Sequence, residues 1–187
     1  IYHLLEKFLE KNLFSIEKKL KYFVNEIYLI FDNNNFFNAE VSIRQNFQKN
    51  SQYNPLNETL IEIKNQFKKY SPDNEIIHMK IKKYIIDGNS YENLPKELKY
   101  DNFIIEVEFI CLENKIIKKL KDIFAKYQIV ITKMFSFKYL TDLSDNRLDI
   151  FEVAQNSMNG LNANEVILIK KKPEIKGFFE KFFNFFN

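Results

Sequence analysis

The sequence predicts an α+β fold, a small sheet with helices packed on one face, followed by a C-terminal amphipathic helix. Several short segments alternate apolar and polar residues, which is typical of strands with one buried face. Between them, apolar residues recur at helical spacing over ten residues or more. The chain has 187 residues, of which 45% are hydrophobic. A packed core is therefore expected, and global disorder is not.

The first 70 residues are expected to hold two helices and two strands. In the expected helices, apolar side chains lie three or four residues apart, with Glu and Lys between them. The first strand is a short apolar run (EIYLIFD), and the second alternates apolar and polar residues (FNAEVSIRQNF). Asn57 is expected to cap the second helix, and Pro72 follows its end. The elements are a helix over residues 2–20, strands over 26–32 and 37–47, and a helix over 57–70.

The next part of the chain is expected to hold three strands and one helix. In the first of these strands, Ile77, Met79 and Ile81 share one face, with His78 on the other. The alternation slips near Lys83, which predicts a β-bulge or a bend. This order of elements is that of a compact α+β domain. The elements are a strand over residues 76–86, a loop over 88–100, a strand over 103–111, a helix over 115–127 and a strand over 128–137.

Beyond Tyr139 the periodic pattern weakens. We expect a helix over residues 148–158, a short strand over 165–169 and a basic junction over 170–172. The chain then ends in GFFEKFFNFFN. On a helix, five phenylalanines of this tail fall on one side, with Lys181 nearby; they are Phe178, Phe179, Phe182, Phe183 and Phe186.

Bulky aromatic residues on one face, with lysines close by, are typical of a helix that lies in a membrane interface. An anionic membrane surface is therefore one expected partner of the tail. The alternative is that these phenylalanines pack on the domain itself or on a partner subunit. No apolar run approaches the roughly 18 residues that span a bilayer.

Charge and reactive residues narrow the function classes. The net charge of +3 favours a neutral surface or a negative membrane face over a dedicated nucleic-acid interface. Cys111 is the only cysteine in the sequence, so an intrachain disulfide and a multi-cysteine metal site are excluded. We expect Cys111 in the core, and cytoplasmic residence. His78 lacks the partners of a metal site, so a structural or surface role is expected, and Glu106 and Glu108 are expected on a solvated sheet face.

Residues 76–95, IIHMKIKKYIIDGNSYENLP, resemble a stretch of the bacterial cell-division protein FtsA family. That stretch has the form hydrophobic-His-x-x-x-x-x-Tyr-x-x-Asp, followed by a loop that reaches a Pro. Here His78, Tyr84, Asp87 and Pro95 stand at the matching positions. The strand, helix and strand that follow are expected in the family's order. The Phe-rich tail resembles the family's C-terminal membrane helix.

The resemblance implies four parts and a function. The parts are a remnant of the actin-like subdomain over residues 1–34, an inserted interaction domain of the 1C type over 35–140, a linker region over 141–172 and a membrane-binding helix over 173–187. The implied function is a division adaptor on the cytoplasmic face of the inner membrane, at the division site. Its implied partners are division proteins, through self-association or contacts with later division proteins.

Catalysis is not expected, and neither is a cofactor. The actin-like ATPase needs glycine-rich phosphate loops, where backbone N–H groups approach phosphate closely. Gly88, Gly160 and Gly177 are the only glycines, and none lies in such a loop. Nucleotide binding is therefore expected to be lost. The family binds FtsZ through a half that has no counterpart in this sequence, so direct FtsZ binding is not expected.

Two other functions stay open at this point. The first is a pilus-assembly adaptor of the PilM type, which shares the actin-like plan. The second is a nucleic-acid-binding α+β module, for which Tyr84, Lys80 and Lys82 are the candidate contacts because RNA-binding sheets stack bases on exposed aromatic residues. We expect no nucleic-acid partner, because most strand aromatics share a face with the aliphatic residues.

Overall fold

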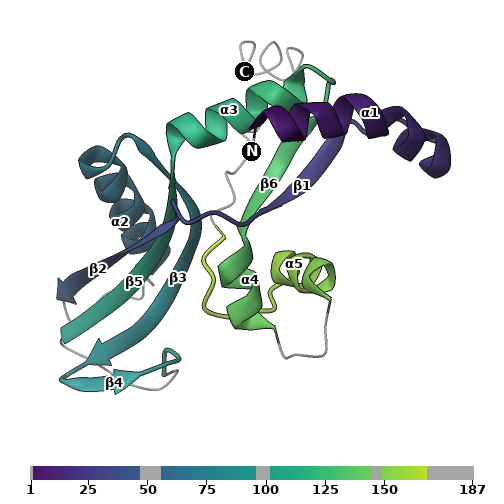
Figure 1. Cartoon of the computed structure of the whole chain (residues 1–187). Coiled ribbons are helices and arrows are strands. Elements are labelled where there is room, and N and C mark those ends of the chain that lie inside the picture. The colour runs from purple at the N-terminus through teal and green to yellow at the C-terminus, as the bar shows by residue number, and fades with distance from the viewer. Residues whose placement is uncertain (1, 47–55, 96–101, 145–148, 168–187) are drawn as a thin grey trace, which may run out of the picture.

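The computed structural model describes residues 2–46, 56–95, 102–144 and 149–167. These residues form helices and strands in a mixed arrangement with two small sheets (Figure 1). The helices are α1 (Tyr2–Leu20), α2 (Leu56–Tyr70), α3 (Asn114–Ala125), α4 (Phe137–Leu143) and α5 (Ile150–Met158). The strands are β1 (Glu26–Phe31), β2 (Phe37–Asn46), β3 (Asn74–Ile86), β4 (Asn89–Tyr91), β5 (Asn102–Glu113) and β6 (Val130–Ser136).

The larger sheet is antiparallel, with the strand order β2-β5-β3-β4. Helix α2 covers one face and packs Leu60, Ile63 and Phe67 onto it. The rings of Phe67 and Phe109 lie 4.7 Å apart. Because successive side chains of a strand point to opposite faces, every second residue of β5 enters this core. These residues are Phe103, Ile105, Val107, Phe109 and Cys111.

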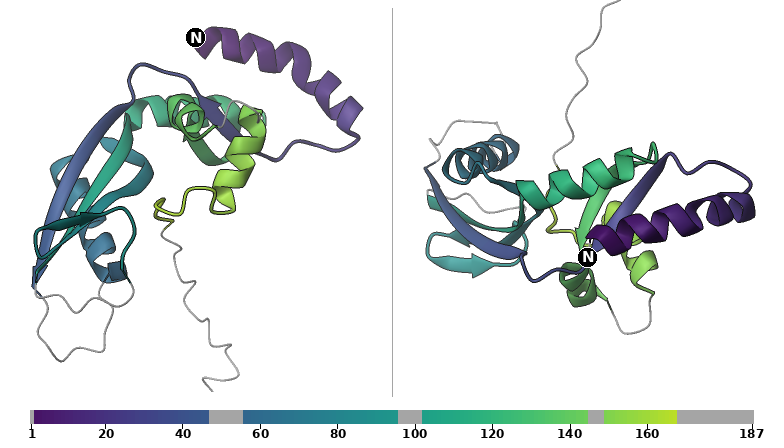
Figure 2. Two further views of the ribbon diagram at one scale, coloured as in Figure 1. Left: turned by 90° about the horizontal axis from the view of Figure 1, so that it is seen from below. Right: turned by 45° about the horizontal axis from the view of Figure 1, so that its top comes forward.

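The smaller sheet consists of β1 and β6, which pair in parallel. The whole larger sheet, with α2 and α3, lies in the chain between these two strands. Helices α1 and α3 lie together along the two-stranded sheet, as Figure 2 shows from two sides, and Leu9 of α1 packs among Ile123 and Phe124 of α3. On another side, α4 and α5 pack against β6 and Ile110 of β5. The larger sheet is thus an insertion into the β1–β6 pair.

The mixed α+β class is confirmed, but the single sheet expected from the sequence is wrong. The last expected strand, β6, pairs with β1 and not with the strands between them. Helix α4 and the short strand β4 were not expected. Helix α5 lies in the expected linker region and buries Val153 and Ala154. Of the expected strand over 165–169, residues 168 and 169 lie outside the described residues, and Glu165 forms a single antiparallel bridge with Lys80.

Strand β3 contains two irregularities in its pairing with β5. One lies between Ile81 and Lys83, as the sequence predicted. The other lies between Ile76 and His78 and reverses part of the predicted face. Ile76 packs with the α2-facing core, whereas the extra residue, Ile77, packs in the cluster of Phe31 and its neighbours. A bulge inserts one unpaired residue, so sequence alternation alone assigned Ile77 to the wrong core.

Candidate functional site

A buried polar cluster lies where β3, β6, α4 and α5 come together. We call it the histidine cluster, and its members are His78, Ser136, Tyr139, Ser157, Asn162 and Glu165. His78 is 1% exposed. Its Nδ1 lies 3.0 Å from Oε1 of Glu165, and its Nε2 accepts a hydrogen bond of 3.1 Å from the backbone N–H of Ser136. The surface role expected as one possibility for His78 is therefore wrong, and the structural role is supported.

Glu165 accepts two further hydrogen bonds within the cluster. Its Oε2 accepts from the hydroxyl of Tyr139 at 2.9 Å and from that of Ser157 at 3.0 Å. The Tyr139 hydroxyl in turn accepts from the side-chain amide of Asn162 at 3.1 Å. The His78 and Tyr139 rings lie 4.0 Å apart and tilted by 32°. Each polar group thus has a partner, as a buried network needs.

Local structure brings these side chains together. The bulge at Ile77 sets the register of His78, and Ser136 is the N-cap of α4, accepting a bond from the Tyr139 backbone N–H. Residues 164–166 lie along β3: the N–H of Ile81 donates to Asn164, and that of Val166 donates to Met79, at 2.9 and 2.8 Å. Glu165 is thereby held beside His78 although 87 positions separate them.

The hydrogen bonds define the protonation of the cluster. Because Nε2 of His78 accepts from a backbone N–H, its proton lies on Nδ1 and is donated to Glu165. Burial lowers the pKa of His78, against the opposing effect of Glu165. Burial alone would raise the pKa of Glu165, but the bonds from His78, Tyr139 and Ser157 outweigh it and lower that pKa. The folded protein therefore holds a neutral imidazole beside a carboxylate.

This arrangement suits a structural joint better than acid–base chemistry. A general base needs a nitrogen that reaches a substrate proton, and both nitrogens of His78 are engaged inside the protein. The carboxylate likewise points inward, with its side chain 4% exposed. The cluster instead ties the segment after α5 to β3 and to the end of β6. Figure 1 shows the course of the backbone through these elements.

The cluster predicts a pH dependence of folding stability. Below the ordinary histidine pKa of about 6.5, the unfolded chain binds a proton that the buried His78 does not take up. The folding stability therefore decreases as the pH decreases. Glu165 acts in the same direction below the ordinary glutamate pKa of about 4.3. In urea titrations from pH 7.5 to 5, His78→Gln should flatten the loss of stability. His3→Gln, at an exposed position of α1, should keep it; equal slopes in His78→Gln and wild type would contradict the assignment.

The four residues of the FtsA-like motif do not form one site. Tyr84 is buried, stacked on Phe103 at 5.8 Å, and Asp87 takes a positive φ of 47° in the exposed turn before Gly88. His78 lies inside β3 and Asp87 directly follows its end, so nine residues, or roughly 30 Å of strand rise, separate them. Pro95 is partly buried in the loop that follows β4. Tyr84 is thus a core residue and is not available to stack on a base.

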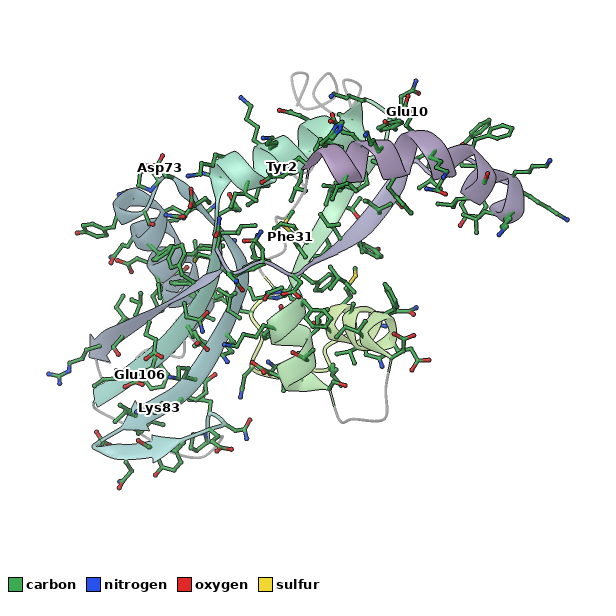
Figure 3. The ribbon with its side chains drawn as sticks, in the orientation of Figure 1. Tyr2, Glu10, Phe31, Asp73, Lys83 and Glu106 are labelled. Carbon is green, nitrogen blue, oxygen red and sulfur yellow. The ribbon has the colours of Figure 1, made fainter. Side chains whose placement is uncertain are left out.

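Ion pairs cross the sheet face that points away from α2. Lys80 lies 2.6 Å from Glu108, and Lys83 lies 3.2 Å from Glu106; Figure 3 labels Lys83 and Glu106 on their strands. Glu108 also accepts from Asn38 at 2.7 Å and is 7% exposed. The expectation of a solvated Glu106–Glu108 face is therefore wrong for Glu108, which is buried by its partners.

A cleft of about 510 Å³ lies between this charged face and α4. Its lining mixes Lys80 and Lys138 with the carboxylates of Asp32, Glu108 and Asp142, so side chains of both charge signs line it. Within the described ranges, no three His, Cys, Asp or Glu side chains gather as metal ligands. Among the described helices, none is long and apolar enough to cross a membrane.

Two sets of residues separate the sequence expectations from the structure. The tail residues expected to bind membrane, Phe178, Phe179, Lys181, Phe182, Phe183 and Phe186, lie outside the described residues. Conversely, Tyr139, Ser157 and Glu165 were not expected as site residues, because they lie at or beyond the point where periodicity weakens. A usable signal was His78 itself, since a buried imidazole needs a polar partner.

In the comparisons with known proteins, no protein-family model and no curated protein matches this chain.

Proposed function

We propose that this chain is a cell-division adaptor similar to FtsA, which acts by binding partner proteins and membrane. In this proposal it binds no nucleotide and catalyses no reaction. The inserted sheet contacts division proteins, and the Phe-rich tail holds the chain on the cytoplasmic face of the inner membrane.

One observation carries the proposal: a complete sheet with its own helix is inserted between two strands that pair with each other. β1 and β6 pair in parallel although residues 32–129 separate them. Parallel sheets are normally wider and covered on both faces, so this pair suits a remnant of a larger scaffold. The FtsA resemblance implies such a scaffold remnant with an inserted interaction domain. The topology therefore supports the parts that the resemblance implies.

The described surface also supports a binding role. β2 and β4 end the larger sheet, and no described strand pairs with the outer edge of β2. Large apolar side chains are exposed along α1 and the turn after it, among them Phe8, Phe14 and Phe23. Unpaired strand edges and exposed apolar side chains are the surfaces by which proteins join partners.

The tail supplies the membrane contact in this proposal. A fully buried phenylalanine contributes about 1.5–3 kcal/mol, and less at an interface. Each lysine near anionic lipid adds about 1 kcal/mol. Five phenylalanines and the adjacent lysines are together strong enough to offset the ordering of a short helix.

We expect the tail to direct binding to anionic vesicles. The full chain should co-sediment with vesicles that contain phosphatidylglycerol and much less with phosphatidylcholine alone, because the lysines add to the apolar contacts. Phe182→Ser combined with Phe183→Ser should lower binding about tenfold or more, since each removes a buried ring. Phe14→Ser, at an exposed ring of α1, is the matched control. Equal loss in both variants would place the lipid contact elsewhere.

The division role is tested in dividing cells with a fluorescent fusion, with and without residues 173–187. A band at mid-cell that disperses when the tail is removed is the expected result. Diffuse signal from both fusions would reject the division role and the anchor together. Pilus-assembly genes as genomic neighbours would favour the pilus-adaptor alternative.

A further inference from the structure

The outer edge of β2 is an open strand edge in the described part of the chain. β2 runs from Phe37 to Asn46 and pairs with β5 along its whole length, so its inner hydrogen bonds are satisfied. Its other edge has no partner among the described strands. Ten residues of regular strand with an open edge form a template for another strand. Figure 1 shows β2 at the border of the larger sheet.

We propose that a second copy of this chain occupies the edge, with its own β2 paired antiparallel about a two-fold axis at Ser42. The inference rests on the proposed adaptor function in treating the inserted sheet as an interaction surface, and it names the partner of that surface. It does not depend on the tail.

Charge complementarity selects the occupant and the register. With the axis at Ser42, residues two before and two after it face each other, so Glu40 of each copy lies opposite Arg44 of the other. Both side chains are exposed, and both lie on the same face of the strand because an even number of residues separates them. Opposite charges directly across a strand pair are favourable, and like charges are not.

The neighbouring registers lack this match. An axis at Glu40 or at Arg44 would set like charges against each other. An axis at Val41 or at Ile43 would leave each charge opposite an uncharged side chain. A two-fold axis that passes between two residues would place side chains from different faces of the strand opposite each other. Antiparallel pairing does not allow this arrangement.

The opposite face of β2 is compatible with the same register. Ala39, Val41 and Ile43 pack against the core under α2, and the axis at Ser42 sets Val41 of each copy opposite Ile43 of the other. β-branched residues paired across strands are favourable. The two sheets then continue into each other, and both α2 helices lie on one side. Lys82, which lies 2.7 Å from Glu40, stays beside the new ion pair.

A charge-swap series tests the proposal by sedimentation of the full chain. Glu40→Arg and Arg44→Glu should each weaken dimerisation about tenfold or more, because each opposes two pairs of like charges. The double variant Glu40→Arg/Arg44→Glu should regain most of the affinity, since the pairs re-form with exchanged signs. Glu10→Arg, an exposed charge on α1 labelled in Figure 3, should leave dimerisation unchanged. Circular dichroism melting checks that each variant is folded.

A thiol at Ser42 tests the register directly. Opposed Cα atoms in an antiparallel pair lie about 4.5–5.5 Å apart, which a disulfide spans. Ser42→Cys should therefore give a covalent dimer under mild oxidation, and Ser90→Cys, exposed on β4 at the other edge, should not. Cys111 stays inert because burial raises its pKa to about 12.

The outcomes separate this inference from the adaptor function. A chain that stays monomeric at about 1 mM overturns the dimer and leaves the vesicle and mid-cell results untouched. A dimerisation affinity that neither charge reversal changes also overturns the proposal, and so does a Ser42→Cys variant that forms no disulfide. A rescued double variant together with the disulfide supports it even if the tail does not bind lipid.

Discussion

Glu165→Ala should lower the free energy of unfolding by about 3 kcal/mol or more, because three buried donors lose their acceptor at about 1–3 kcal/mol each. The variant leaves the His78 Nδ1–H and the Tyr139 and Ser157 hydroxyls without their acceptor. Buried donors without partners are costly because folding has removed their water. Urea unfolding followed by circular dichroism at pH 7 measures the change.

A graded series distinguishes the cluster from a general effect of truncation. Ser157→Ala removes one of the three donors to Glu165 and should cost about 1 kcal/mol. Glu106→Ala removes a partly exposed carboxylate that pairs with Lys83 and should cost about 0–1 kcal/mol. If Glu165→Ala behaved like Glu106→Ala, the segment after α5 would not be held by the cluster in solution.

Most elements of the fold were predictable from local pattern. Helices α1, α2 and α3 and strands β1, β2, β3 and β5 follow the apolar spacing of their residues closely. Local spacing reports which face of an element is buried. It does not report which element covers that face. The pairing of β6 with β1, and hence the presence of two sheets, was therefore beyond a reading of periodicity.

The histidine cluster was missed for a related reason. Helix α4 spans only seven residues, which is too short for a helical period to stand out. Glu165 acts through one bridge and two backbone hydrogen bonds to β3, and such contacts have no sequence period. Of the candidate functional residues, His78 and those of the tail were identified from the sequence. The partners of His78 could be identified only from the three-dimensional structure.

Phe109→Ala is expected to destabilise the whole described structure by about 3–5 kcal/mol, the usual cost of truncating a buried phenylalanine to alanine. Phe109 is 0% exposed at the centre of the larger sheet, against Phe67 of α2. The loss of stability should extend beyond the larger sheet, because β5 contributes side chains to three hydrophobic cores. Phe109 packs under α2, Ile110 packs with α4 and α5, and Leu112 packs with α3.

Because one strand joins the three cores, we expect the two sheets to unfold in one transition. Circular dichroism and tyrosine fluorescence should then give the same urea midpoint, in wild type and in Phe109→Ala; the chain has ten tyrosines and no tryptophan. Tyr70→Ala, at a side chain 89% exposed, should change stability by no more than about 0.5 kcal/mol. Separate midpoints for the two probes would mean that the inserted sheet unfolds independently of the β1–β6 pair. In that case Phe109 would stabilise the larger sheet alone.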